Sequence, residues 1–459
     1  MSLDLSWLDI NQHVYTWNAI EDEQYRTEIG LLALQLMDKH QSINPQEENI
    51  LAYLDSKGIE HGYNHDWFRN IQNKTVEVIK NLENSLDSVQ DLNKSISTAV
   101  RDNQDLWNQI EQGVKISIIL GSYNQGLGFL TTYGQFIQFQ TQLNNREQLD
   151  ENKYIQFLFY QYMVNTYNLI YFPEEHVISG SYKSLELILK KLNYYYNKNE
   201  MIMIQNPDSH EVKYYWLIKF YNLTILFKQF KIDEFLVEFN QILKIPEFIW
   251  LIQSNSNILS LFQIFFTLMK PFNQLGLLDS DDDFLIDEIN YHQFPKFIYN
   301  NILSPLLNSN FTQVQTTFSD TRFINFFNAK LGYYLPASIN KSSFLDYFHL
   351  VIDFKIFLLI LSNTKVIPRP KMLSILGYQD LSKQSTLSND LLVLLSTLNL
   401  GNSNIGYDFQ NDCFYNHDKD HQRDSLQLKN SIDNLTVELQ GESIAQLLKG
   451  ALIEKFMSS

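Results

Sequence analysis

The sequence predicts an all-α fold, in which a TPR-like, right-handed helical solenoid precedes a winged-helix domain with a small β-hairpin and a C-terminal helix. Two observations predict the solenoid. Glycine and proline are scarce, at 16 and 10 of 459 residues, and apolar residues recur mostly at steps of three and four, the spacing of one helix face. A third observation predicts the winged helix: after about residue 340, prolines and an alternating pattern replace the long helical runs.

The solenoid is expected over 106–296, with a more polar helical region over 1–105. In 214–230, apolar residues at helical steps include Leu217, Phe220 and Phe227. Short polar links join similar segments at 114–140, 153–172, 181–197, 234–244, 256–270 and 295–307. Helices with such brief connectors pack as antiparallel pairs, and stacked pairs form a solenoid.

The winged helix is expected over about 344–417. A long helix at 344–362 precedes Pro368 and Pro370, and a short helix should begin near Lys371. A further helix should begin after Ser388, a good N-cap, and end at Gly401.

A β-hairpin should follow at 404–417, turning at Gln410-Asn411. Alternation predicts that Ile405, Tyr407 and Phe409 point to one side of it, and Gly406 and Asp408 to the other. Helix, short helix, helix and hairpin is the order of a winged-helix domain.

Charge and cysteine content limit the classes of function. The net charge of −17 disfavours general affinity for nucleic acid or anionic membrane. A single cysteine excludes an intrachain disulfide and indicates a reducing compartment. The charged residues of 344–362 and the shortness of 257–269 argue against membrane spans, so we expect a soluble protein without a signal peptide.

The segment 407–423 is the richest in side chains able to bind a metal: Asp408, Asp412, Cys413, His417, Asp418, Asp420 and His421. A zinc site needs four converging ligands, usually in close pairs. His417 and His421 have a suitable spacing, but no second cysteine completes a pair with Cys413. We therefore expect a solvated hairpin and a charged link, with no metal and no cofactor; a metalloenzyme centred on 408–421 is the less favoured reading.

No motif predicts an enzyme. The stretch 120–128 lacks the third glycine of a dinucleotide-binding loop and predicts a tight turn between helices. The stretch 279–290 places Phe284 where a calcium loop needs glycine, and Asn290 where it needs glutamate. Histidine and aspartate are common enough to leave a dispersed triad open, but no pattern nominates one. The expectation is a non-enzymatic protein with no catalytic residues.

A winged helix raises the alternative of nucleic-acid binding. The predicted helix at 388–401 contains no Lys or Arg and carries Asp390, which suits the major groove poorly. A basic face would have to be assembled from scattered residues: Lys365, Arg369, Lys371 and Lys383. The helix has more leucines than one internal face needs, at 391, 392, 394, 395 and 398, so it is expected to meet protein.

The arrangement resembles the PCI domain, a module shared by the proteasome lid, the COP-9 signalosome and translation initiation factor three. Segments 297–320, 371–378 and 391–415 are similar to its helix pair, short helix, leucine-rich helix and hairpin. Residues 414–423, "FYNHDKDHQR", resemble the signalosome branch of the family. Tyr407, Gly406 and Asn402-Ser403 depart from the usual aliphatic, basic and apolar residues.

The resemblance implies domains at 297–420, as the PCI domain, and at 421–459, as a tail helix. It also implies a non-catalytic scaffold, cytoplasmic and nuclear, that supports removal of a ubiquitin-like modifier from cullins. Expected partners are other PCI subunits, an MPN metalloprotease subunit and cullin-RING ligases. The proteasome lid and initiation factor three remain alternatives. The implied winged-helix interface comprises Leu391, Leu394, Leu395, Leu398, Ile405, Tyr407, Asp408, Phe414 and Tyr415.

The tail carries two apolar stripes at helical spacing. They consist of Leu428, Ile432, Leu435 and Leu439, and of Ile444, Leu447, Leu448 and Leu452. An isolated helix would leave such stripes exposed to water, so we expect them to join a helical bundle with partner subunits. The alternative is that the tail folds back on its own solenoid.

Overall fold

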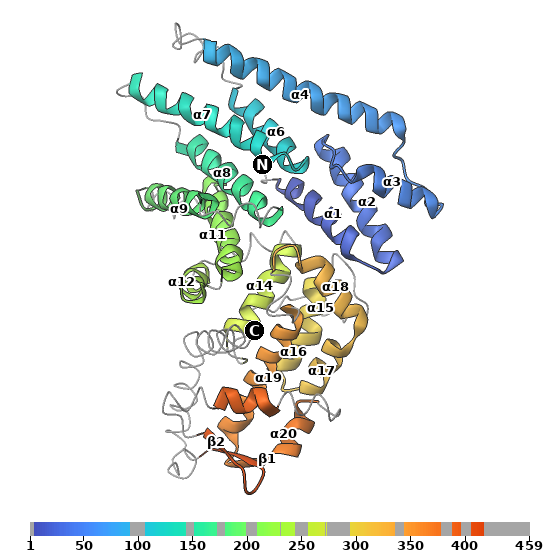
Figure 1. Ribbon diagram of the computed structural model, residues 1–459, viewed down its shortest axis with the longest axis vertical. Helices are drawn as coiled ribbons and strands as arrows, with labels where there is room; N and C mark the ends of the chain where they lie inside the picture. The colour runs from blue at the N-terminus through green and yellow to red at the C-terminus, as the bar shows by residue number, and fades with distance from the viewer. Residues whose placement is uncertain are drawn as a thin grey trace. The chain divides into compact units, whose positions relative to one another are not determined.

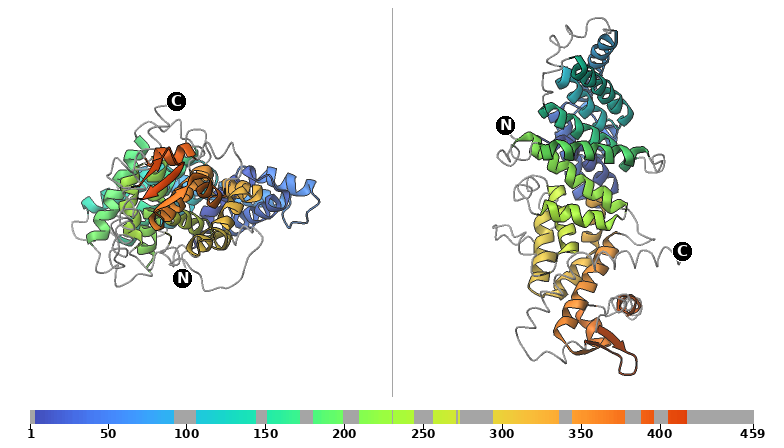
Figure 2. Two further views of the ribbon diagram at one scale, coloured as in Figure 1. Left: turned by 90° about the horizontal axis from the view of Figure 1, so that it is seen from below. Right: turned by 90° about the vertical axis from the view of Figure 1, so that its left-hand side faces the viewer.

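The computed structural model describes residues 4–91, 106–143, 151–171, 180–198, 209–229, 231–243, 256–270, 272, 294–335, 344–377, 388–395 and 405–416 (Figures 1 and 2). This part is mostly helical, with a small three-stranded sheet, in agreement with the all-α class. The contacts divide the chain into unit 1 (Met1–Ile225 and Ile242–Phe248) and unit 2 (Leu226–Gln241 and Ile249–Ser459). The domain boundaries expected from the sequence stay predictions.

Unit 1 consists of helices, most of which pack on the next helix along the chain (Figure 1). They are η1 (Ser6–Leu8), α1 (Asp9–Ala19), α2 (Glu23–His40), α3 (Glu47–Ser56), α4 (His65–Asp91), α6 (Leu106–Ile119), α7 (Tyr123–Leu143), α8 (Glu151–Tyr171), α9 (Gly180–Lys198) and α11 (His210–Lys228), whose last residues belong to unit 2. Direct contacts join α1 to α2, α6 to α7, α7 to α8 and α8 to α9.

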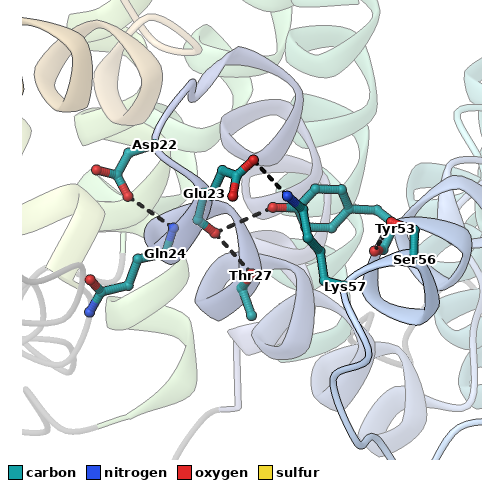
Figure 3. Close-up of polar contacts among 7 residues, drawn as sticks. All are labelled: Asp22, Glu23, Gln24, Thr27, Tyr53, Ser56 and Lys57. Carbon is teal, nitrogen blue, oxygen red and sulfur yellow. Dashed lines mark hydrogen bonds and ion pairs between the residues drawn. The ribbon is translucent and has the colours of Figure 1, made fainter.

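The start of α2 shows how local polar groups fix a helix end and its neighbour (Figure 3). Asp22 caps the helix, because its Oδ1 accepts hydrogen bonds from the backbone N–H groups of Gln24 (2.9 Å) and Tyr25 (3.2 Å). The next residue, Glu23, holds α3: Lys57 Nζ lies 2.6 Å from its Oε1, and the Tyr53 hydroxyl donates to its carbonyl.

A tight turn separates α6 from α7. Gly121 adopts a φ of +72°, a left-handed conformation that favours glycine, and the N–H of Ser122 donates to the carbonyl of Ser117. The inter-helix turn predicted within 120–128 is confirmed at 120–122, whereas 123–128 form the start of α7. Consequently the apolar stretch 114–140 forms parts of two helices rather than one.

Unit 2 contains α12 (Ile232–Ile242), α14 (Ser256–Met269), α15 (Phe294–Ile298), the π-helical turn η3 (Tyr299–Leu303), α16 (Ser304–Leu307), α17 (Phe311–Ser319), α18 (Thr321–Leu331) and α19 (Phe344–Asn363). Its core is rich in phenylalanine: Phe327 and Phe344 each stack on Phe348. No described helix has the length and apolar character that crossing a bilayer requires.

Helix α19 is buried along most of its length and carries two charged side chains inward. Lys355 Nζ donates to three carbonyls at the end of α14, those of Thr267, Leu268 (3.2 Å) and Lys270 (2.7 Å). These carbonyls have no partner within the helix, so the lysine replaces the missing hydrogen bonds.

The second inward charge is Asp353, which belongs to a polar cluster between α17 and α19. Its Oδ1 accepts a hydrogen bond of 2.6 Å from Gln315 Nε2. Gln315 Oε1 in turn lies 2.7 Å from His349 Nε2, and the His349 ring stacks on Phe318. The cluster satisfies the buried carboxylate from a neighbouring helix.

After α19 come β1 (Val366–Pro368), α20 (Arg369–Ile375), a helical segment over 388–395, β2 (Ile405–Asp408) and β3 (Cys413–Asn416) (Figure 2). The strands are antiparallel in the order β1-β3-β2. The predicted hairpin is confirmed, and α20 begins at Arg369 rather than Lys371.

Two details differ from the sequence prediction. Strand β1 was not expected. Ser388 is already helical at the start of the described segment 388–395, and its buried hydroxyl has no partner in the described chain, so it does not act as the predicted N-cap. Phe409 lies in the turn beyond β2 and is 80% exposed, but its ring meets that of Tyr407 edge to face at 4.9 Å, which agrees with the predicted common side of the hairpin.

Candidate protein-interaction site

The candidate site is built on the small sheet and the helices that cover it. We call the elements from α19 to β3, residues 344–416, the sheet module. Its core lies between α19 and β3, where the rings of Phe357 and Phe414 meet edge to face at 5.0 Å. The module also buries Ile367 of β1 and Met372 and Leu373 of α20.

A buried asparagine joins β3 to the end of α19. Asn416 Nδ2 donates to the carbonyl of Leu361 at 2.9 Å, and its backbone N–H donates to the carbonyl of Lys365 at 2.8 Å. These carbonyls belong to the last turn of the helix and the residues beyond it, which have no helical partner. The sheet is therefore fixed on α19 by polar contacts as well as by packing.

The structure separates the predicted interface residues into two groups. The first is buried: Leu391, Leu394, Leu395, Ile405 and Phe414. The second is partly exposed and consists of Tyr407, Asp408 and Tyr415. Leu398 lies outside the described residues. Burial in the core leaves no surface for a partner, so only the second group can contact another protein without unfolding the module.

Large exposed apolar side chains of the module come from residues that the sequence did not nominate. Phe409 is 80% exposed in the turn, Val366 is 58% exposed on β1, and Val393 is exposed on the helical segment. Phe409 directly precedes the predicted turn pair Gln410-Asn411, a position that could have indicated exposure. Such side chains supply apolar contact area to a partner.

The hairpin turn is fixed by Asp408. Its carboxylate accepts from the Asn411 side chain at 2.6 Å and from the backbone N–H groups of Gln410 (2.9 Å) and Asn411 (3.3 Å). These hydrogen bonds, first that of the Asn411 side chain, hold the pKa of Asp408 below its ordinary value. Asp408 is therefore engaged in its own turn.

Asp412 links the hairpin to α20. It adopts a φ of +49°. Its carboxylate lies 2.9 Å from Arg369 Nε and accepts a hydrogen bond from the Tyr407 hydroxyl, while its carbonyl accepts from the N–H of Arg369 at 3.0 Å. Burial, and then this hydrogen bond, raises the pKa of Tyr407.

Gly406 departs from the basic residue expected by resemblance, and the sheet gives the reason. It lies opposite Tyr415 in the β2–β3 register. A Cβ at position 406 would overlap the hydroxyl and Cζ of the Tyr415 ring. The glycine therefore makes room for an aromatic ring that crosses the strand.

The metal-binding residue types of 407–423 do not converge within the described chain. Asp408 and Asp412 are engaged as above, and Cys413 is a buried free thiol. Among the described residues, no group of three His, Cys, Asp or Glu side chains could hold a metal ion. His417, Asp418, Asp420 and His421 lie outside them.

A cavity of about 260 Å³ lies in unit 1 between α1, residues 44–46 and the α6–α7 turn. Its asparagines already bind backbone: Asn11 Nδ2 donates to the carbonyl of Ile118, and Asn44 Nδ2 donates to Asn11 Oδ1 and to the carbonyl of Ile119. Since these amides hold α1 against the end of α6, they are structural.

The described part of the sheet module offers little support for the alternative of nucleic-acid binding. The helical segment 388–395 contains no basic residue, and Arg369 is paired with Asp412. Lys365 and Lys371 are exposed, but Lys365 precedes β1 and Lys371 follows it, and Lys383 is outside the described residues. Phosphate binding needs a larger basic cluster.

No family model matches the chain, and no curated protein matches it. The PCI assignment therefore stays a proposal.

The tail residues expected to join a helical bundle also lie outside the described residues. They are Leu428, Ile432, Leu435, Leu439, Ile444, Leu447, Leu448 and Leu452.

Proposed function

We propose that the protein is a non-catalytic scaffold subunit of a COP-9 signalosome-type complex, similar to the first subunit of that complex. Its helices would form a TPR-like solenoid, and the sheet module would be the winged helix of a PCI domain. In this role it supports removal of a ubiquitin-like modifier from cullins by a separate metalloprotease subunit. A subunit of the proteasome lid or of initiation factor three is the alternative.

One observation supports the proposal most. The order α19, β1, α20, 388–395, β2 and β3, with the strands arranged β1-β3-β2, agrees with what a winged helix would require. Preceding helices that pack in sequence are what a solenoid requires. The exposed apolar side chains Val366 and Phe409 suit an interface with protein.

Affinity purification tests the proposal. The tagged full-length chain is compared with a version that ends at Asp424, and co-purifying proteins are identified by mass spectrometry. We expect PCI and metalloprotease subunits with the full-length chain, and fewer of them with the shortened one. The identity of these subunits distinguishes the signalosome from the lid and the initiation factor. Recovery of the full-length chain alone would overturn the assembly role.

A surface variant tests the sheet module separately. Val366→Glu with Phe409→Glu places charge on its exposed apolar residues and should reduce recovery of the partners. Val237→Glu is the matched control, because Val237 of α12 is similarly exposed but lies outside the module. Equal loss with the control would show that the module surface has no special part in assembly.

A further inference from the structure

Helix α9 (labelled in Figure 1) carries two large exposed side chains on the side opposite its buried residues. Leu185, Ile188 and Leu192 are buried at helical spacing. On the opposite side, Leu187 and Tyr194 are 55% and 67% exposed. Seven residues make about two turns, so these two side chains lie in line, about 10 Å apart.

Lysines surround these two side chains. Lys183 and Lys190 lie one turn before and one turn after Leu187, and Lys191 lies beside them; all three are exposed. Within the described chain none of them forms an ion pair. Glu186 is the one acidic residue of α9, in a protein whose net charge is −17. This face is therefore locally basic on an acidic molecule.

We propose that Lys183, Leu187, Lys190, Lys191 and Tyr194, the α9 surface, bind an acidic amphipathic helix of a partner protein. Two apolar side chains of that helix, two turns apart, would cover Leu187 and Tyr194, and flanking Asp or Glu would pair with the lysines. Charge complementarity selects this partner, since a basic segment would be repelled and an uncharged one would leave the lysines unpaired. The inference is independent of the PCI assignment.

Peptide selection identifies what the surface prefers. The full-length chain is screened with a phage-displayed random library of peptides about 18 residues long, or five helical turns. Counter-selection uses the Leu187→Ser, Tyr194→Ser variant. We expect enrichment of acidic sequences with apolar residues seven apart.

Two variants and one control then measure affinity for the enriched peptide by fluorescence anisotropy. Leu187→Ser with Tyr194→Ser, and Lys183→Glu with Lys190→Glu and Lys191→Glu, should each weaken binding about tenfold or more. The control is Val76→Ser with Lys80→Glu, an exposed valine and lysine one turn apart on α4, and should change affinity less than about twofold. Circular dichroism verifies that the variants are folded. If the serine variant does not fold, the affinity of the charge variant alone tests the proposal.

Several outcomes would overturn the proposal. They are the absence of enrichment over the counter-selected variant, enrichment of basic or neutral peptides, and equal binding by all variants. Binding of a single-stranded oligonucleotide that the charge variant abolishes would make nucleic acid the ligand instead. Tenfold stronger peptide binding by the version ending at Asp424 would identify the chain's own tail as the occupant.

Discussion

Each unit buries an ionisable side chain in its interior, and the two side chains differ in what surrounds them. In unit 2, Lys355 donates to three carbonyls at the end of α14. In unit 1, Glu47 of α3 is 1% exposed, and neither carboxylate oxygen has a hydrogen-bond partner in the described chain. The end of α14 thus supplies hydrogen-bond partners for Lys355, whereas no described group does so for Glu47.

The pKa values follow from this difference. Burial lowers the pKa of Lys355 to about 7, but the three carbonyls and the negative end of the α14 dipole favour the charged ammonium. Burial, with a smaller effect of Glu48, raises the pKa of Glu47 to about 7, and no contact opposes it. The stability of unit 1 should therefore depend on pH near neutrality through Glu47, whose carboxylate has no hydrogen-bond partner in the described chain.

Removing the lysine tests the partnered charge and should have the largest effect. Lys355→Met leaves the carbonyls of α14 buried without partners, so we expect unfolding free energy to fall by roughly 3 kcal/mol. Urea unfolding measures the loss, and hydrogen–deuterium exchange should place it at α14 and α19. Lys371→Met on the surface of α20 is the control and should change stability by less than about 0.5 kcal/mol. Equal stability of the two variants would contradict the capping role.

The sheet of unit 2 should not tolerate a side chain at position 406, because the Tyr415 ring occupies that space. Gly406→Ala forces the Tyr415 ring off the strand, and we expect a loss of about 1–3 kcal/mol. In a Tyr415→Ala background the same change should become neutral or slightly stabilising, because alanine is the better strand residue once space exists. Thermal unfolding of the four proteins gives the coupling. Additive effects would show that the ring is not the obstacle.

Glu47→Gln tests the unpartnered charge. The folded pKa of Glu47, about 7, lies above the ordinary 4.5, so the folded state holds a proton that the unfolded state has lost. The resulting stability is complete below pH 4.5 and is lost as the pH rises to 7. Allowing for nearby solvent, Glu47→Gln should stabilise the protein at pH 8 by on the order of 1–2 kcal/mol and change little at pH 4.

The exposed neighbour Glu48 provides the control for this experiment. Glu48→Gln should leave most of the pH dependence in place, since it removes only the smaller influence on Glu47. Urea unfolding across the pH range distinguishes the two variants. A pH profile that Glu47→Gln leaves unchanged would mean that another group carries the dependence.

The smallest effect is expected at an exposed ion pair. Arg369→Ala removes the contact with Asp412, but both side chains are more than 40% exposed. Pairs of this kind contribute about 0–1 kcal/mol, and salt should reduce the loss further. Unfolding measured at low and high sodium chloride tests this, and a loss above about 2 kcal/mol would mean that the pair supports the hairpin more than its exposure indicates.

The sequence predicted those parts of the sheet module that depend on neighbouring residues. Alternation around Gln410-Asn411 identified the hairpin, and Pro368 and Pro370 located the short helix to within two residues. Strand β1 was missed because it is three residues long, contains Pro368 and forms only by pairing with β3, far along the chain. Local pattern cannot report such a pairing.

The candidate site was predicted less well, for a related reason. Leu391, Leu394 and Leu395 were assigned to an interface because they exceed one helix face, yet all three are buried within unit 2. Helical spacing indicates which residues share a face, but not whether the chain itself covers that face. The burial of the Glu47 carboxyl likewise depends on tertiary packing.

The ring of Tyr415 over Gly406 also has a consequence for how this sequence can change over time. A side chain can enter position 406 only after the ring at position 415 has become smaller, whereas the ring can be lost at any time. With the strand pairing of this chain, a bulky residue should therefore occupy one of these positions or the other, and not both. The order of substitution would be fixed as well, with position 415 changing first.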